Sequence, residues 1–128
     1  MFLEMVKAEG LAALSYVIGD GENAAVIDPQ RDCERYIDIA HRNGARITHI
    51  FETHRNEDYI IGSQDLAART GAEILHGKNF DFHYGRPLAE GDEFAFGQTL
   101  KLKVLETPGH TDESISVVAF DTGFNEQQ

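Results

Sequence analysis

The pattern of apolar and polar residues divides the first half of the chain into short strands followed by helices. Residues 2–7 and 13–18 are β-favouring runs, and a turn cluster follows at residues 19–23. A compact apolar run over residues 24–28 comes next and stops at Pro29, which cannot donate to a strand ladder. Neighbouring runs separated by such turns form antiparallel hairpins. We therefore predict that the chain opens with antiparallel strands.

Helical spacing appears in the middle of the chain. Asp32 is a typical helix N-cap, and Asn43-Gly44 suits the end of that helix. An apolar strand is predicted over residues 47–51, a second helix over about residues 60–69, and a short strand over residues 72–75. The apolar face of the first helix comprises Cys33, Tyr36, Ile37 and Ala40.

The second half of the chain is rich in β-strand patterns. Residues 100–105 alternate apolar and cationic side chains, as a half-exposed strand does, and a last strand is predicted over residues 114–120. A Thr-Pro-Gly-His-Thr segment at residues 107–111 lies between them, and the tail from Asp121 is polar. Turns are predicted at residues 77–79, 90–92 and 97–98.

These elements predict an α/β fold, with strands joined by hairpins and by two helical crossovers. We expect a mixed sheet with two helices on one face, in one domain over residues 1–128 and with no second domain. No helix follows the last predicted strand, so the other face of the sheet is expected to lack a cover. That expectation implies either a missing C-terminal segment or association through the exposed face, as in a homodimer.

Composition narrows the class of protein. The 128 residues are 41% apolar and 26% charged, which is typical of a globular domain. A net charge of −11 disfavours nucleic acid or an anionic membrane as the main partner, but it is compatible with a small anionic ligand. Cys33 is the single cysteine, which excludes an internal disulfide and fits a reducing compartment. No apolar run has membrane-spanning length, so we predict a cytoplasmic protein.

Two histidines stand where α/β proteins commonly place chemistry. His54 follows an apolar strand directly, in the segment Thr53-His54-Arg55-Asn56-Glu57-Asp58-Tyr59. His110 lies in a turn between two strands, where Gly109 lets the backbone pass close to a ligand. They are far apart in sequence, so only the fold can bring them together.

Each of these residues also has an ordinary structural interpretation. A lone histidine near a turn is commonly a surface or capping residue, and Asp58 is a good N-cap for the helix that follows it. Cys33 lies on the buried face of a predicted helix, which favours packing over nucleophilic chemistry. No metal-ligand spacing is present around the remaining histidines, which we interpret as structural or exposed: His41, His49, His76 and His83.

The two motifs together resemble the metallo-β-lactamase superfamily, whose usual His-x-His-x-Asp-His loop is followed later by a Gly-His turn. The segments Glu52–Tyr59 and Thr107–Ser114 are most similar to the branch of persulfide dioxygenases and their rhodanese-fused bacterial relatives. The resemblance covers nearly the whole chain. It implies an αββα sandwich, of which these residues form the N-terminal half to two-thirds.

The departures from the family loop distinguish two kinds of metal site. Asn56 stands at the second histidine of that loop and Tyr59 at the last one. A two-zinc hydrolase of the glyoxalase II kind uses both histidines, and neither asparagine nor tyrosine is a common zinc ligand. The resemblance instead implies mononuclear Fe(II) on His54, His110 and a downstream aspartate, with open positions for substrate and dioxygen.

The third ligand is not evident. The family aspartate lies in a Gly-Asp segment one strand beyond the Gly-His turn, and the sequence ends at Gln128 before such a segment. Asp121 follows the last predicted strand in a context typical of a hairpin turn, and either it or Asp58 remains open as a substitute carboxylate. We therefore expect that these residues belong to a longer chain.

The resemblance also implies roles for the neighbouring residues. Asp58 is expected to hydrogen-bond a ligating histidine or a bound water, and Tyr59 to do the same or to fill the space of a second metal. Asn56 is a further alternative ligand. Arg55 is a candidate contact for an anionic substrate in an otherwise acidic protein.

Three functions from different classes stay open. The first is an iron-dependent dioxygenase that oxidises glutathione persulfide or a similar thiol persulfide to sulfite. The second is a zinc-dependent hydroxyacylglutathione hydrolase, which cleaves a thioester without consuming dioxygen. The third is an inactive half-domain that associates with itself, because two histidines alone hold a metal weakly.

Overall fold

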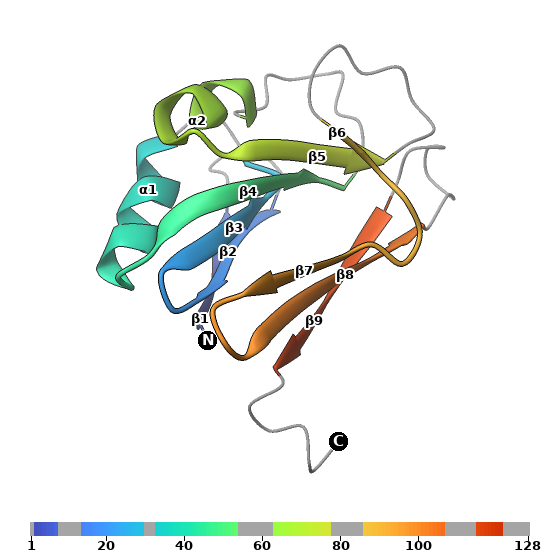
Figure 1. Ribbon diagram of the computed structural model, residues 1–128. Helices are drawn as coiled ribbons and strands as arrows, with labels where there is room; N and C mark the ends of the chain where they lie inside the picture. Colours follow the sequence, from blue (N-terminus) through green and yellow to red (C-terminus); the bar gives the residue numbers. More distant parts are fainter. Residues whose placement is uncertain are drawn as a thin grey trace.

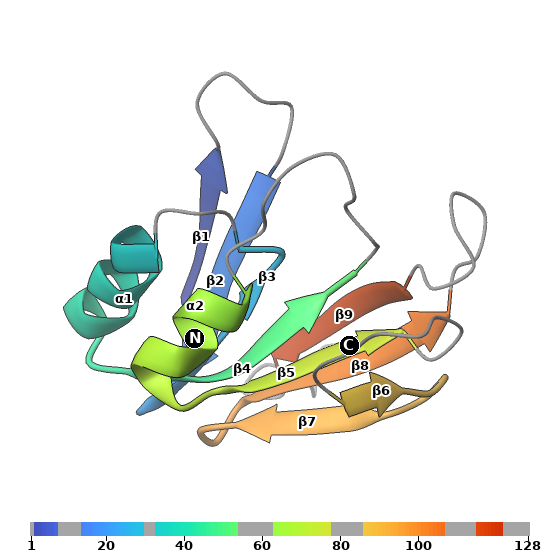
Figure 2. The same ribbon diagram turned by 90° about the horizontal axis from the view of Figure 1, so that it is seen from above.

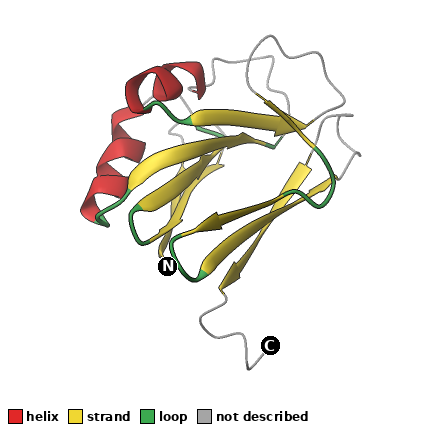
Figure 3. Ribbon diagram, in the orientation of Figure 1, coloured by secondary structure: helices red, strands yellow, loops and turns green. Residues whose placement is uncertain are grey.

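The structure is a computed structural model that describes residues 2–7, 14–29, 33–53, 63–77, 86–106 and 115–121. Two β-sheets lie face to face, and two helices cover the outer side of the larger sheet (Figures 1 and 3). The larger sheet has six strands in the order β1-β2-β3-β4-β5-β6, and the smaller has three in the order β7-β8-β9. The observed layers are therefore a helix layer, a mixed sheet and a second sheet, as in a partial αββα sandwich.

After the first hairpins, helices alternate with strands as far as β5, and the elements described after β5 are all strands. The first three strands are antiparallel, whereas β3, β4, β5 and β6 run parallel to one another. The elements are β1 (Phe2–Lys7), β2 (Leu14–Asp20), β3 (Asn23–Ile27), α1 (Cys33–Arg42), β4 (Arg46–Glu52), α2 (Ser63–Thr70), β5 (Glu73–Gly77), β6 (Arg86–Leu88), β7 (Glu93–Phe96), β8 (Leu100–Glu106) and β9 (Ile115–Asp121).

Helices α1 and α2 pack on one face of the six-stranded sheet, as the sequence predicts. The buried residues of α1 recur at helical spacing and join a core cluster with apolar residues of β2, β3 and β4. At the end of α1, Gly44 takes a left-handed conformation with φ 72°, and its N–H donates to the carbonyl of His41. Helix α1 connects the parallel strands β3 and β4, and helix α2 connects the parallel strands β4 and β5. These two helices thus cover one face of the large sheet.

The opposite face of the large sheet is covered by β7, β8 and β9, which corrects the expectation of an uncovered face. Strand β8 alternates strictly: Leu100, Leu102 and Val104 are buried, whereas Lys101 and Lys103 are half-exposed. The buried set joins Phe51 and Leu75 of the large sheet in a second core cluster between the sheets. The apolar surface that remains exposed in the described part of the chain includes Leu3, Met5 and Phe120.

A hydrogen-bonded contact ties the two sheets together at one edge. The Oδ2 atom of Asp20, at the end of β2, accepts from the backbone N–H of Thr99 at 2.8 Å, from its hydroxyl at 2.8 Å and from the N–H of Gln98 at 3.0 Å. These donors, first the Thr99 N–H and then its hydroxyl, hold the pKa of Asp20 well below its usual value, although burial opposes the shift. Gly97 precedes this turn with φ 57°, and a Cβ there would lie 2.6 Å from the Asp20 carbonyl oxygen.

The remaining differences from the sequence predictions concern short strands and boundaries. Strands β6 and β7 were not predicted, because three or four residues are too few for a visible alternation. Asp121 is the last residue of β9 and pairs with Leu100, so it is not in a turn. None of the described helices is long and apolar enough to cross a membrane.

Candidate metal centre

The residues predicted to hold or surround a metal fall in two segments that lie outside the described residues. His54, Arg55, Asn56, Asp58 and Tyr59 follow β4, and His110 follows β8. The structure therefore shows where the two strands before these segments end. Whether the two histidines meet stays a prediction.

These strand ends point to the same edge of the sandwich. Strands β4 and β5 are parallel. Figures 1 and 2 show their carboxyl ends on the same side of the molecule as the carboxyl end of β8. Strand β4 ends at Glu52, two residues before His54, and β8 ends at Glu106, four residues before His110. Ligand sites of α/β sheets commonly lie beyond the carboxyl ends of strands. The strands that precede both histidine segments thus end at one edge.

Asp121 lies at the opposite end of β9 from this edge. Strand β9 runs antiparallel to β8, with Ile115 opposite Glu106 and Asp121 opposite Leu100. Because a strand rises ~3.4 Å per residue, Asp121 lies roughly 20 Å along β9 from the end that adjoins the His110 turn. This position at the far end of β9 argues against Asp121 as the third ligand, and Asp58 lies outside the described residues.

The start of the His54 segment is held by a carboxylate from the neighbouring strand. Asp28 directly follows β3, and its Oδ1 accepts from the N–H of Thr53 at 2.8 Å while its Oδ2 accepts from the Thr53 hydroxyl at 2.5 Å. The N–H of Asp28 donates in turn to the carbonyl of Phe51 at 2.8 Å. Asp28 adopts φ 54°, a left-handed conformation that aspartate tolerates better than most residues. Thr53 is thus fixed directly before the candidate ligand His54.

Two buried hydroxyls extend this contact to helix α1. The hydroxyl of Ser15 donates to the carbonyl oxygen of Asp28 at 2.6 Å, and the hydroxyl of Tyr36 donates to the Ser15 oxygen at 3.0 Å. Ser15 is fully buried and Tyr36 is 1% exposed. Tyr36 was predicted to lie on the apolar face of a helix, and no role was predicted for Ser15 or Asp28. The signal in the sequence that could have pointed to Asp28 is its position at the end of an apolar run, directly before Pro29.

Glu52 and His76 are two buried polar residues at this edge that sequence analysis did not select. The strand over residues 47–51 was predicted to end before Glu52, but Glu52 is the last residue of β4 and only 2% exposed. His76 is 3% exposed and lies one residue before the end of β5. The prediction that His76 is structural or exposed is consistent with the buried position.

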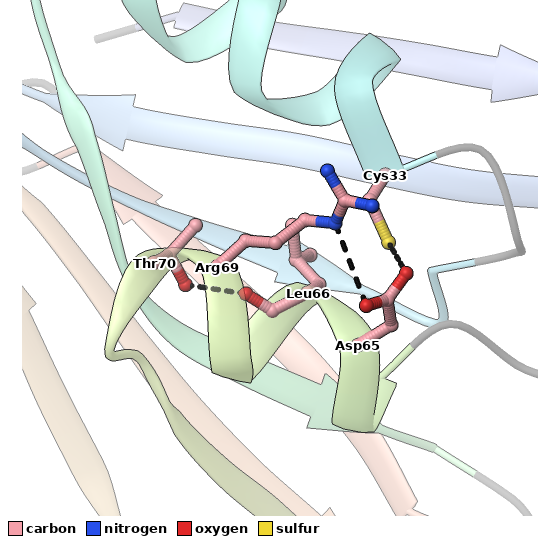
Figure 4. Close-up of polar contacts among 5 residues, drawn as sticks. All are labelled: Cys33, Asp65, Leu66, Arg69 and Thr70. Atoms are coloured by element: carbon pink, nitrogen blue, oxygen red, sulfur yellow. Dashed lines mark hydrogen bonds and ion pairs between the residues drawn. The ribbon is translucent and has the colours of Figure 1, made fainter.

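Other titratable residues have positions that argue for packing. His49 is half-buried between the sheets, with its ring centroid 5.4 Å from that of Phe94 and 5.0 Å from that of Phe96. Cys33 is 3% exposed, and its thiol donates to Asp65 Oδ2 at 3.5 Å. Figure 4 shows Asp65 between Cys33 and Arg69, whose Nε lies 3.4 Å from Asp65 Oδ1. The prediction of a packed cysteine is confirmed.

The described part of the chain contains no group of three histidine, cysteine or acidic residues able to hold a metal. The predicted ligands His54 and His110 lie outside these described residues. Imidazoles suit iron and zinc alike, so the donor type fits either metal. Asn56 and Tyr59 in place of two further histidines fit one metal better than a pair of zinc ions.

Comparison with known proteins defines the class of this chain. The metallo-beta-lactamase superfamily matches residues 8–124, and the chain belongs to this superfamily. A hydroxyacylglutathione hydrolase of Nitrosococcus oceani is 40% identical over 125 residues, which cover 93% of this chain and 47% of that protein. The chain thus spans about half the length of this curated relative.

Two solved structures show the same fold at higher than 30% identity. ETHE1 from Myxococcus xanthus is 33% identical with a TM-score of 0.84, and the alignment covers 93% of this chain and 54% of that one. A metallo-beta-lactamase from Staphylococcus aureus subsp. aureus COL is 36% identical with a TM-score of 0.86, covering 98% of this chain and 40% of that one. Both confirm that the sandwich is a partial metallo-β-lactamase domain.

Proposed function

We propose that this chain is the N-terminal part of a mononuclear iron dioxygenase that oxidises a thiol persulfide, such as glutathione persulfide, to sulfite and the thiol. The observation that carries the proposal is the pattern of retained and lost histidines. His54 and His110 are retained, and both follow strands that end at one edge of the sandwich. Two histidines that a two-zinc site would use, one in each metal site, are replaced by Asn56 and Tyr59. The structural similarity to ETHE1 supports this branch of the superfamily.

The residues of this chain would contribute binding and orientation. His54 and His110 would supply two imidazole ligands, and a carboxylate from Asp58 or from sequence beyond Gln128 would complete the set. Arg55 would attract the anionic substrate, and Asp58 or Tyr59 would hydrogen-bond a ligand to fix its ring. Asp28 would hold the start of the loop through Thr53. Bound iron would supply the redox chemistry that lets dioxygen oxidise the terminal sulfur.

A zinc-dependent hydroxyacylglutathione hydrolase is the second candidate, because the curated relative from Nitrosococcus oceani carries that name. The two candidates share a glutathione-bearing substrate but differ in co-reactant. The dioxygenase consumes one dioxygen and one water per persulfide, and releases one sulfite and one thiol. The hydrolase consumes water alone and cleaves a thioester.

The test compares both reactions in the complete encoded protein, purified without oxygen. Dioxygen uptake and sulfite release with glutathione persulfide are measured beside hydrolysis of S-lactoylglutathione. Uptake matched by sulfite, with negligible thioester hydrolysis, is the expected result. Fast thioester hydrolysis without dioxygen uptake would replace the dioxygenase with the hydrolase.

Variants assign the reaction to the predicted ligands. His54→Ala and His110→Ala are each expected to lose bound iron and dioxygen uptake, whereas His41→Ala, on the exposed side of α1, is expected to keep both. Unchanged iron content in His54→Ala would remove it from the ligand set. A protein without metal that forms a dimer through Leu3, Met5 and Phe120 would favour the inactive, self-associating half-domain.

A further inference from the structure

A pocket lies between helices α1 and α2, at the opposite end of β4 from the candidate metal centre. Its volume is about 240 Å³, and its walls include Ile37, Ala40, Arg46, Ile47, Arg69 and Thr70. Arg46 begins β4, whereas the His54 segment follows the other end of that strand at Glu52. A strand rises ~3.3 Å per residue, so roughly 20 Å of β4 separates this arginine pocket from the candidate metal edge.

The charge of the arginine pocket is opposite to that of the protein as a whole. Arg46 and Arg69 line it, and none of the described residues on its walls is acidic. The whole chain, in contrast, has a net charge of −11. Positive charge concentrated in a concave site raises the local concentration of anions. The pocket therefore favours an anionic occupant.

The ends of the helices explain only one of these arginines. Arg69 lies in the last turn of α2, where a basic side chain compensates the negative end of the helix dipole. Arg46 is the first residue of a strand, and its exposed side chain makes no ion pair with the described residues. Its guanidinium therefore has hydrogen-bond donors to offer a ligand.

The contacts of Arg69 also leave it able to bind a ligand. Its Nε lies 3.4 Å from Asp65 Oδ1, and the two side chains are 50% and 60% exposed, so this ion pair contributes little to stability. Figure 4 shows that Asp65 is also bound by the thiol of Cys33 on α1. A guanidinium carries five N–H donors, of which Nε–H is one. Arg69 can therefore keep its contact with Asp65 and donate to a bound anion.

The rest of the described pocket wall includes an aliphatic surface. Ala40 and Ile47 are 1% and 4% exposed, and Ile37 packs against the same core cluster. A guanidinium matches the two oxygens of a carboxylate with two parallel hydrogen bonds. We propose that the arginine pocket binds a small organic carboxylate, with its charge on the two arginines and its apolar group against the aliphatic wall. The ligand is small because sites for drug-sized molecules occupy about 300–1,000 Å³.

The experiment follows the backbone amide resonances of the complete encoded protein, isotopically labelled, during titration with benzoate. Benzamide supplies the same ring without the charge, and acetate supplies the charge without the ring. Benzoate should shift the amides of Ile47 and Thr70 in a saturable way. Its affinity should be about tenfold higher than that of benzamide or acetate, because each of these lacks one of the two interactions.

Variants assign the binding to the two arginines. Arg46→Gln and Arg69→Gln should each weaken benzoate binding about tenfold, because each removes charge-assisted hydrogen bonds. Both side chains are exposed, so the unfolding midpoints of these variants should match that of the unmodified protein. Arg35→Gln, at an exposed position of α1 outside the pocket wall, is the matched control and should bind benzoate normally.

Several results would overturn the inference. The absence of any saturable shift at the pocket amides contradicts it, as does equal affinity for benzoate and benzamide. Inorganic phosphate that binds as tightly as benzoate would show that the apolar wall contributes nothing to recognition. Unchanged affinity in both folded arginine variants, or an equal loss in Arg35→Gln, would remove the pocket as the site. The outcome is independent of the reaction at the metal edge, so failure of the proposed function leaves this test valid.

Discussion

The two strand ends that lead to the candidate ligands are built in different ways. The end of β4, before His54, is held by polar side chains: Asp28 binds Thr53, and Glu52 is buried opposite His76. The strand β8, before His110, is held by a backbone ladder to β9 along its whole length and by the buried side chains of Leu100, Leu102 and Val104. Directional polar contacts specify geometry, whereas apolar burial mainly supplies stability.

This contrast predicts that the two ends respond differently to substitution. A change at the β8 end should reduce the free energy of unfolding but leave metal binding by the folded molecules unchanged. A change at the β4 end should reduce metal affinity by more than its effect on stability would suggest.

The largest effect on stability is expected from Leu102→Ala. Leu102 is fully buried between the sheets, so the change removes buried apolar atoms and leaves a cavity. The free energy of unfolding should fall by about 3 kcal/mol, measured by chemical denaturation. Metal affinity per folded molecule should stay within about twofold of the unmodified protein, and a tenfold loss would show that the two ends do not differ in this way.

Asp28→Ala should affect both quantities. It removes two hydrogen bonds to a carboxylate and places alanine at φ 54°, so unfolding should become easier by about 2 kcal/mol. Metal affinity, measured by titration, should fall about tenfold because Thr53 is released. Asp28→Asn is the control, since asparagine tolerates this backbone conformation and keeps one acceptor. Unchanged affinity in Asp28→Ala would remove Asp28 from the support of the site.

Asp20→Asn tests the contact between the sheets, far from both strand ends. Its pKa is depressed in the folded state, so its contribution is present above the unfolded-state pKa of about 4 and is lost as the pH falls through the folded-state pKa. The variant should lose about 1 kcal/mol of stability at pH 7, and this difference should shrink in strong acid. A difference that is constant with pH, by denaturation at several pH values, would contradict this assignment.

A similarly small effect on stability is expected from Tyr36→Phe. The change removes the hydrogen bond to Ser15 while keeping the buried ring, so unfolding should become easier by about 1 kcal/mol. Metal affinity should change less than in Asp28→Ala, because Ser15 still donates to the Asp28 carbonyl. A larger loss of affinity than in Asp28→Ala would place the support of the loop in α1 instead of at Asp28.

Local signals in the sequence predicted much of the fold. The alternation in β8 and the helical spacing in α1 correspond to observed burial, because each pattern reflects one covered face. Strands β6 and β7 were missed because they are too short to show a period. The cover of the second face was missed because it depends on how distant strands fold back over the large sheet.

The candidate site shows the same division between local and long-range information. The sequence motifs select His54 and His110, and the strands before them are observed to end at one edge. The contacts of Asp28 with Thr53 and the register of Glu52 with His76 depend on strand pairing. A single glutamate after an apolar run carries no local signal of burial, so the strand was predicted to end before Glu52.

The most direct test of the central claim is the metal content of the complete encoded protein, purified without oxygen and measured by elemental analysis. The proposed function predicts close to one iron per chain, lost in both His54→Ala and His110→Ala. Two zinc ions per chain would contradict it and return the protein to the hydrolases of its superfamily.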